Sequence, residues 1–225
     1  MVQGGHWSPP MLSPASFYNS AYDFLPAKPM VDTESEFEGI LGYGGSPNEV
    51  VGPEQTRRGA YYSIQLGGFG FTYGAHGLWY PTQSDTEDKY WADWGQSSPW
   101  WVALNFPAGQ QMQYLRALYE SVNWWELEPL PDGMVRTDGT AVEDWYQPRA
   151  KAKGDEVYLI WFPYGSDGNA AYTLRRQASS SRTFNAKWFD PQTGLFATAL
   201  PVSCAATECA VPARPDNADW VLVLE

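Results

Sequence analysis

The sequence has little positive charge, no long apolar run and no leader at its start. Lys and Arg number 14 against 26 Asp and Glu, which gives a net charge of −12. Such a chain repels phosphates, so nucleic acid and anionic membranes are poor partners. No apolar stretch approaches the roughly 20 residues of a membrane-spanning helix. Residues 1–6 lack the basic start and the apolar segment of a signal peptide.

Cysteine and histidine are also scarce, with two of each. Cys204 and Cys209 enclose four residues in a stretch rich in Pro and Ser, which is typical of a disulfide at a hairpin tip; two free thiols are the alternative. No His or second Cys pair lies nearby, so we expect no metal site. A disulfide implies an oxidising compartment. We therefore expect a secreted protein whose signal peptide lies on an N-terminal part that this sequence lacks.

Motifs for two common chemistries are missing as well. No Gly-x-Ser-x-Gly elbow is present, which argues against a serine hydrolase of that type. Residues 67–70 are rich in Gly but lack the Lys and the spacing of a phosphate-binding loop. We accordingly expect no cofactor.

Aromatic residues, in contrast, are abundant. They make up 16% of the chain, with 12 Trp and 14 Tyr. Such side chains often form flat platforms for ligands with apolar faces, and sugar rings are ligands of this kind. The alternative is that these rings pack in the core and at domain contacts.

The first half of the chain has the pattern of an α/β protein. Residues up to about 27 are rich in Pro and Ser and predict a loop. Residues 28–34 predict a short buried strand that ends in acid. Residues 53–66 predict a helix that begins at Pro53 and ends before Gly67, and residues 69–73 predict a strand. Strand, helix and strand form a βαβ unit, which predicts parallel pairing.

The second half has a different texture. After a loop at 82–99 and a helix at 108–122, whose apolar stripe we assign to the core, short strands and turns follow. Strands are predicted at 156–162, 186–189, 195–200 and 219–224, as in a small antiparallel β-sandwich. We place the domain boundary near residue 131, which gives one domain at 1–131 and a second at 132–225.

An acidic cluster follows the first predicted strand. Glu34, Glu36 and Glu38 share a face if the chain stays extended, whereas Glu34 and Glu38 share one if it turns helical. Ligands of (β/α) barrels bind at the carboxyl ends of the strands, and glycoside cleavage commonly uses two carboxylates. A carboxylate of this cluster is therefore in the right place to act as nucleophile or as acid/base. The alternative is a solvated acidic loop.

Four segments of the first half together resemble the apiosidase-like glycoside hydrolases. The segments are residues 3–6 (QGGH), 28–34 (KPMVDTE) with 37–38 (FE), 57–61 (RRGAY) and 68–79 (GFGFTYGAHGLW). Residues 158–165, 188–194 and 219–224 resemble the small domain that often follows them, which is named a collagen-binding domain. The family commonly has Ser at the position of Gly4 and Gln at that of His76, so contacts there differ.

The resemblance implies the C-terminal portion of a (β/α)8 TIM barrel followed by a small antiparallel β-sandwich. It implies that Glu34 is the nucleophile of a retaining reaction, and that the acid/base carboxylate lies on an earlier strand that precedes Met1. We expect a carbohydrate substrate and, for a partial barrel, a chain that is inactive or poorly folded alone. The substrate-binding candidates are Glu38, His6, Tyr73, His76 and Trp79.

Two further expectations remain open at this stage. The alternative to a hydrolase is a non-catalytic carbohydrate-binding module, in which the aromatic surface holds polysaccharide and the acidic residues serve solubility. Collagen binding finds no support in the sequence, because no Gly-rich or charged binding stripe is visible.

Overall fold

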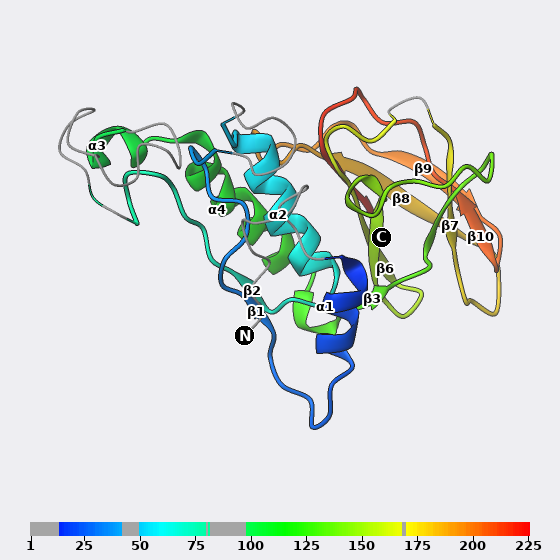
Figure 1. Cartoon of the computed structure of the whole chain (residues 1–225). Helices are drawn as coiled ribbons and strands as arrows, with labels where there is room; N and C mark the ends of the chain where they lie inside the picture. The colour runs from blue at the N-terminus through cyan, green and yellow to red at the C-terminus, as the bar shows by residue number, and fades with distance from the viewer. Residues whose placement is uncertain (1–13, 42–49, 80, 82–97, 168–169) are drawn as a thin grey trace. The chain divides into compact units, whose positions relative to one another are not determined.

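The computed structural model describes residues 14–41, 50–79, 81, 98–167 and 170–225 (Figure 1). The chain divides into two compact units, Met1–Gln113 and Tyr114–Glu225. The boundary that the sequence predicts near residue 131 stays a prediction. Among the described residues, no helix has the length and apolarity that a bilayer crossing requires.

The N-terminal unit is built around a small parallel sheet. Strand β1 (Val31–Asp32) pairs with β2 (Gly70–Phe71), so that Val31 lies opposite Gly70 and Asp32 lies opposite Phe71. Helix α2 (Pro53–Gln65) connects the two strands in sequence. The predicted parallel βαβ unit is confirmed. The strands are shorter than predicted, because the chain on either side continues through single bridges and bends rather than a regular ladder.

Three more helices belong to this part of the chain. They are α1 (Ala15–Tyr22), α3 (Trp100–Ala103) and α4 (Pro107–Glu120), which continues into the C-terminal unit. The prediction of a loop up to residue 27 is wrong over α1. Its sequence, ASFYNSAY, contains Ser, Asn and aromatic residues, which have only modest helix propensity. Burial of Ala15 and Tyr18 stabilises this helix instead.

Helix α2 begins and packs for reasons that the sequence contains. Pro53 occupies the first turn, where its missing N–H costs nothing, and the Gln55 side chain accepts the Gly52 N–H at 3.0 Å. Most of its residues are buried. Gly59 lets the helix approach the segment after β1, since a Cβ at this position would lie 2.3 Å from the Ser35 hydroxyl oxygen.

The C-terminal unit contains two antiparallel sheets. One sheet has the strand order β3-β5-β6-β11-β8-β9, and the other has the order β10-β7-β4. The strands are β3 (Glu128–Leu130), β4 (Met134–Arg136), β5 (Arg149–Lys153), β6 (Val157–Phe162), β7 (Tyr172–Arg175), β8 (Arg182–Phe189), β9 (Leu200–Cys204), β10 (Glu208–Ala210) and β11 (Trp220–Leu224). Two short 3-10 helices complete the unit, at Trp124–Glu126 and Asp144–Tyr146.

A single apolar cluster draws side chains from both sheets. Alternate residues of β6, namely Tyr158, Ile160 and Phe162, belong to it together with Leu174 of β7. Alternation of this kind places every second side chain on one face of a strand. The predicted strands at 156–162 and 219–224 are confirmed by β6 and β11.

The prediction of a strand at 195–200 is wrong, because β9 begins at Leu200, where that prediction ended. The residues before it follow a turn in which Asp190 accepts the Gln192 N–H at 2.8 Å and the Thr193 hydroxyl at 2.8 Å. Only one isolated bridge, between Phe189 and Phe196, is described in this stretch.

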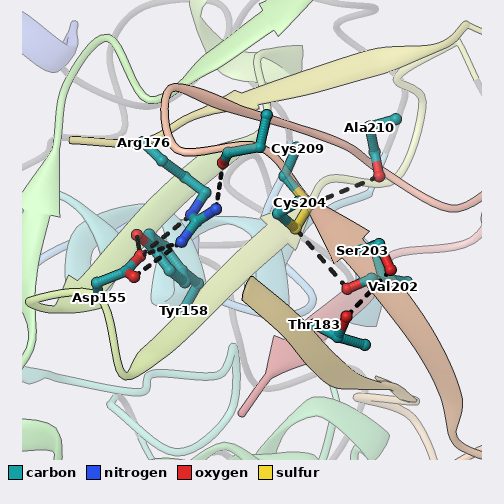
Figure 2. Close-up of a disulfide and its surroundings, with 10 residues drawn as sticks. Asp155, Tyr158, Arg176, Thr183, Val202, Ser203, Cys204, Cys209 and Ala210 are labelled. Carbon is teal, nitrogen blue, oxygen red and sulfur yellow. Dashed lines mark hydrogen bonds and ion pairs between the residues drawn. A yellow bond between two sulfur atoms is a disulfide. The ribbon is translucent and has the colours of Figure 1, made fainter. Parts of the chain in front are cut away.

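A disulfide joins Cys204 of β9 to Cys209 of β10 (Figure 2). The turn between them is held from a second side by the guanidinium of Arg176, which donates to the carbonyl oxygen of Ala205. The same guanidinium donates to both carboxylate oxygens of Asp155, at 2.7 and 2.8 Å. Covalent and ionic contacts thus meet at one end of the unit.

Candidate active site

Glu34 lies on a bend two residues beyond the carboxyl end of β1. Its backbone N–H donates to Oδ1 of Asp32 at 3.2 Å, and its side chain is half-buried. Asp32 itself is buried and accepts the Tyr18 hydroxyl on Oδ2 at 2.6 Å. Burial, reinforced by the Asp32 carboxylate, raises the pKa of Tyr18. The Tyr18 hydroxyl therefore stays protonated and donates to Asp32. This hydrogen bond holds in place the Asp32 carboxylate, which accepts the Glu34 backbone N–H.

Glu36 turns inward and meets helix α2. Its Oε1 accepts a hydrogen bond from the Arg58 guanidinium at 2.8 Å, and both side chains are less than a tenth exposed. Burial raises the pKa of the Glu36 carboxyl, and Arg58 opposes that shift. Glu36 Oε2 and the Ser35 hydroxyl are buried and have no hydrogen-bond partner among the described residues. Glu36 thus belongs to the interior of the unit.

Glu38 binds the start of helix α4. Its two carboxylate oxygens lie 3.2 and 3.1 Å from the Ala108 N–H, which donates to them, and Oε2 also accepts the Tyr73 hydroxyl at 2.9 Å. A carboxylate at a helix N-terminus satisfies free N–H groups and complements the helix dipole. Burial raises the pKa of Glu38, whereas these hydrogen bonds and the charge of Arg57 lower it.

Tyr73 is positioned by the same contact. Burial, followed by the neighbouring Glu38 carboxylate, raises the pKa of the Tyr73 hydroxyl. The phenol ring also rests on Gly109, where a Cβ would lie 3.0 Å from two ring carbons. Tyr73 and Glu38 therefore act together to join the end of β2 to the start of α4.

His76 and Trp79 lie on the turn that follows β2. The His76 N–H donates to the Glu38 carbonyl at 2.8 Å, and its ring meets the Trp79 ring edge-on with centroids 5.8 Å apart. His76 is buried, whereas Trp79 is 40% exposed. Of the two, Trp79 is the side chain that can offer a ring face to a ligand.

The structure brings four of the predicted site residues together. Glu38, Tyr73, His76 and Trp79 form one connected group, whereas His6 lies outside the described residues. Glu34 occupies the bend at the end of β1. The segment from Glu34 to Glu38 is not helical, so the helical alternative is wrong. Glu36 and Glu38 contact different helices, α2 and α4.

Tyr18 and Arg58 are the residues that sequence reasoning missed. The two adjacent arginines of the predicted helix, Arg57 and Arg58, are a partial signal, since Arg is rarely buried unless a carboxylate pairs with it. Tyr18 carried no such signal, because its helix was not predicted. Among the described residues, no three His, Cys, Asp or Glu side chains are grouped so that they could hold a metal ion.

Comparison with known proteins agrees with this architecture. Two solved structures are similar: one described as a glycoside hydrolase (22% identity, TM-score 0.71) and a family 5 glycoside hydrolase from Bacteroides vulgatus ATCC 8482 (21% identity, TM-score 0.73). Each match covers 93% of this chain but only 45% and 44% of those chains, so this chain spans less than half of their length. No curated protein matches the sequence.

The sequence also matches two protein families. Residues 147–225 match the family described as "Putative collagen-binding domain of a collagenase". Residues 1–126, more than half of the chain, match the family described as "Apiosidase-like, catalytic domain". The chain is glycoside hydrolase-like, and it belongs to the apiosidase-like family.

Proposed function

We propose that this chain is the carboxyl-terminal part of a retaining glycoside hydrolase in which Glu34 is the nucleophile. The observation that carries the proposal is the contrast between Glu34 and its acidic neighbours. Asp32, Glu36 and Glu38 are all at most 3% exposed and so are closed to a ligand. Glu34 is half-buried at the carboxyl end of β1, where barrel enzymes bind their ligands.

The reaction would proceed in two displacements. A Glu34 carboxylate oxygen attacks the anomeric carbon, and the bond to the leaving-group oxygen breaks as a second carboxylic acid protonates that oxygen. Water, deprotonated by that second carboxylate, then attacks the anomeric carbon and releases Glu34. The acid/base group of retaining enzymes lies roughly 5–5.5 Å from the nucleophile. The engaged carboxylates Asp32, Glu36 and Glu38 are poor candidates for it.

By the resemblance to the apiosidase-like family, we place the acid/base group on an earlier strand of the barrel. This chain alone would hydrolyse unactivated glycosides too slowly to detect. The βαβ unit supports the assignment of the N-terminal unit to the last part of a (β/α)8 barrel. The apolar cluster shared by two antiparallel sheets supports a β-sandwich, and the disulfide supports secretion.

A substrate whose leaving group needs no proton tests Glu34 without its partner. We expect 2,4-dinitrophenyl 2-deoxy-2-fluoro glycosides of arabinose and glucose to label the chain covalently, because dinitrophenolate departs unprotonated and the fluorine slows release. Peptide mass spectrometry should place the label on Glu34. Glu34→Gln should abolish labelling, and Glu54→Gln, an acidic residue in the first turn of α2, should leave it unchanged.

Label on another residue, or labelling that survives in Glu34→Gln, would overturn the nucleophile assignment. Sugar binding with no labelling in either form would instead favour a non-catalytic carbohydrate-binding role. Robust turnover of unactivated glycosides by the chain alone would contradict the proposed absence of the acid/base group.

A further inference from the structure

Large apolar side chains gather in the open around the short helix α3. Trp100, Trp101, Val102 and Leu104 are 43, 47, 45 and 57% exposed, and the rings of Trp100 and Trp101 meet edge-on with centroids 5.6 Å apart. Contiguous exposed apolar side chains are uncommon on soluble proteins and often belong to a site that binds a ligand or a partner. A Trp side chain in water loses the free energy that burial would give, so a pair of them requires an explanation.

The turn that carries Trp79 contacts helix α3. The turn contains Gly77, which has a φ of +93°. This glycine packs against Ala103 of α3 and against Ser98, just before that helix. A Cβ on Gly77 would lie 2.4 Å from the Ser98 carbonyl oxygen and 3.2 Å from the Ala103 Cβ. Trp79 lies two residues farther along the same turn. The turn and the helix thus present three exposed indoles, which we call the tryptophan platform (Trp79, Trp100 and Trp101).

The platform lies beyond the carboxyl ends of the parallel strands, as Glu34 does. The two chain segments that leave β1 and β2 remain paired as they run outward, since Glu38 bridges to Ala75 and the His76 N–H donates to the Glu38 carbonyl. The turn that carries Trp79 begins at this bridge. Figure 1 shows the chain running from β2 toward α3 at the end of this unit away from the β1 and β2 labels. Glu34 is near the strands, and the platform is farther out on the same side.

The chemistry of the platform selects a neutral sugar chain. Indole rings stack on the C–H faces of pyranose rings, and the indole N–H can donate to a hydroxyl. The chain carries a net charge of −12, which disfavours an acidic polysaccharide. The Glu38–Ala75 bridge lies between Glu34 and the turn that carries Trp79, so a ligand that occupies both places must extend past it.

We propose that Trp79, Trp100 and Trp101 form a distal subsite that binds a neutral polysaccharide by ring stacking. The inference rests on the proposed function, in that the bound polymer is the substrate whose linkage Glu34 attacks. The platform therefore sets a preference for polymers over short glycosides, and its contribution is to binding.

Affinity gel electrophoresis of the full chain tests this directly. Barley β-glucan, konjac glucomannan and arabinoxylan serve as neutral probes, and polygalacturonate serves as the acidic one. At least one neutral polymer should retard the protein and polygalacturonate should not. Trp100→Ala with Trp101→Ala should weaken the apparent affinity roughly tenfold or more. Trp100→Phe with Trp101→Phe, which keeps two rings, should restore part of it and guards against misfolding.

The C-terminal unit provides a matched control. Trp124 and Trp125 are also an adjacent edge-on pair, with centroids 6.2 Å apart, and Trp125 is 65% exposed. Trp124→Ala with Trp125→Ala should leave retardation unchanged. An equal loss of retardation in the two double variants would overturn the proposal, because it would show that any exposed Trp pair binds these polymers nonspecifically. Absence of retardation by all neutral polymers, or retardation by polygalacturonate alone, would also overturn it.

Two measurements separate this inference from the proposed function. Glu34→Gln should bind the polymers as well as the parent chain, so loss of covalent labelling and loss of binding report different sites. Sedimentation velocity tests whether the platform serves a second copy of the chain. A dimer that Trp100→Ala with Trp101→Ala dissociates, without any change in polymer binding, would overturn the subsite.

Discussion

The two units of the chain bury different chemistry. The N-terminal unit holds Asp32, Glu36, Glu38, Arg57 and Arg58 at 8% exposure or less around a parallel sheet of two short strands. The C-terminal unit also buries four charged side chains (Arg149, Lys151, Arg176 and Asp219), but its core is one large cluster of apolar side chains drawn from strands of two antiparallel sheets. Charged groups enter an interior only when they are paired or hydrogen-bonded. The comparison therefore teaches that the N-terminal unit is shaped by specific polar contacts, and the C-terminal unit by the alternation of its strands.

The largest test of this comparison removes one half of a buried ion pair. Arg58→Met leaves the Glu36 carboxylate buried without its 2.8 Å partner. We expect a loss of about 3–5 kcal/mol in the free energy of unfolding of the N-terminal unit. Hydrogen exchange measured peptide by peptide would locate the loss in α2 and the segment after β1, with the β6 and β11 peptides unchanged.

The matched control for this prediction is the double variant Glu36→Leu with Arg58→Met, which removes both charges. It should recover most of the lost protection, because replacing a whole buried pair is often nearly neutral. A single-variant loss below about 1 kcal/mol would show that polar contacts do not organise this unit.

A charge that breaks the pattern of the C-terminal unit gives a second test. Lys151 of β5 is 4% exposed, and burial lowers the pKa of its ammonium to about 8. The folded protein therefore releases the Lys151 proton at a lower pH than the unfolded chain, which holds it up to about pH 10.4. The wild type should gain stability as the pH rises through the window from about 8 to about 10.4.

Lys151→Met removes this titration. At pH 7 the variant should be more stable than the wild type by about 1–3 kcal/mol, and the difference should shrink as the pH is raised to 10. Urea unfolding at pH 7 and pH 10, followed by tryptophan fluorescence, measures both. A difference independent of pH would mean that Lys151 remains protonated in the folded state.

The smallest expected effect concerns close packing in the N-terminal unit. Gly→Ala inside a helix usually stabilises it by about 0.5–1 kcal/mol, but at Gly59 the added Cβ would meet the Ser35 hydroxyl at 2.3 Å. We expect Gly59→Ala to cost about 1 kcal/mol in the free energy of unfolding, because overpacking outweighs propensity. Adding Ser35→Ala should reverse the sign. A stabilising Gly59→Ala would indicate that the helix can move away from the segment after β1.

Much of the regular structure could be predicted from local sequence. Helices α2 and α4 were expected at 53–66 and 108–122 and occur at Pro53–Gln65 and Pro107–Glu120, because Pro at the start and an apolar stripe are local signals. Strands β5 and β7 were missed: the apolar residues of RAKAK are alanines, which are poor strand formers, and YTLR is too short to stand out. Pairing on both sides, of β5 with β3 and β6 and of β7 with β10 and β4, makes these segments strands.

The candidate site was less predictable than the fold. The sequence places Glu34 after a strand, and the structure keeps it there. It also shows why the neighbouring acids differ, since Glu36 and Glu38 each contact a helix that begins 15 or more residues later in the chain. Partners at that separation, such as Arg58 and Ala108, have no local signature. The role of each predicted site residue remains a prediction that the labelling and binding experiments address.

The parallel pairing of β1 and β2 has a consequence for how the protein could be assembled. A strand at the edge of a sheet presents a row of backbone N–H and C=O groups to which a further strand can pair. Within the part of the chain that the structure describes, this sheet consists of β1 and β2. On the proposed barrel assignment, a separately produced polypeptide with the preceding barrel strands would pair at these edges. The same edges would recruit copies of this chain into aggregates at high concentration. Co-expression with such a polypeptide therefore tests the proposed function, because it should produce the hydrolysis that the chain alone lacks.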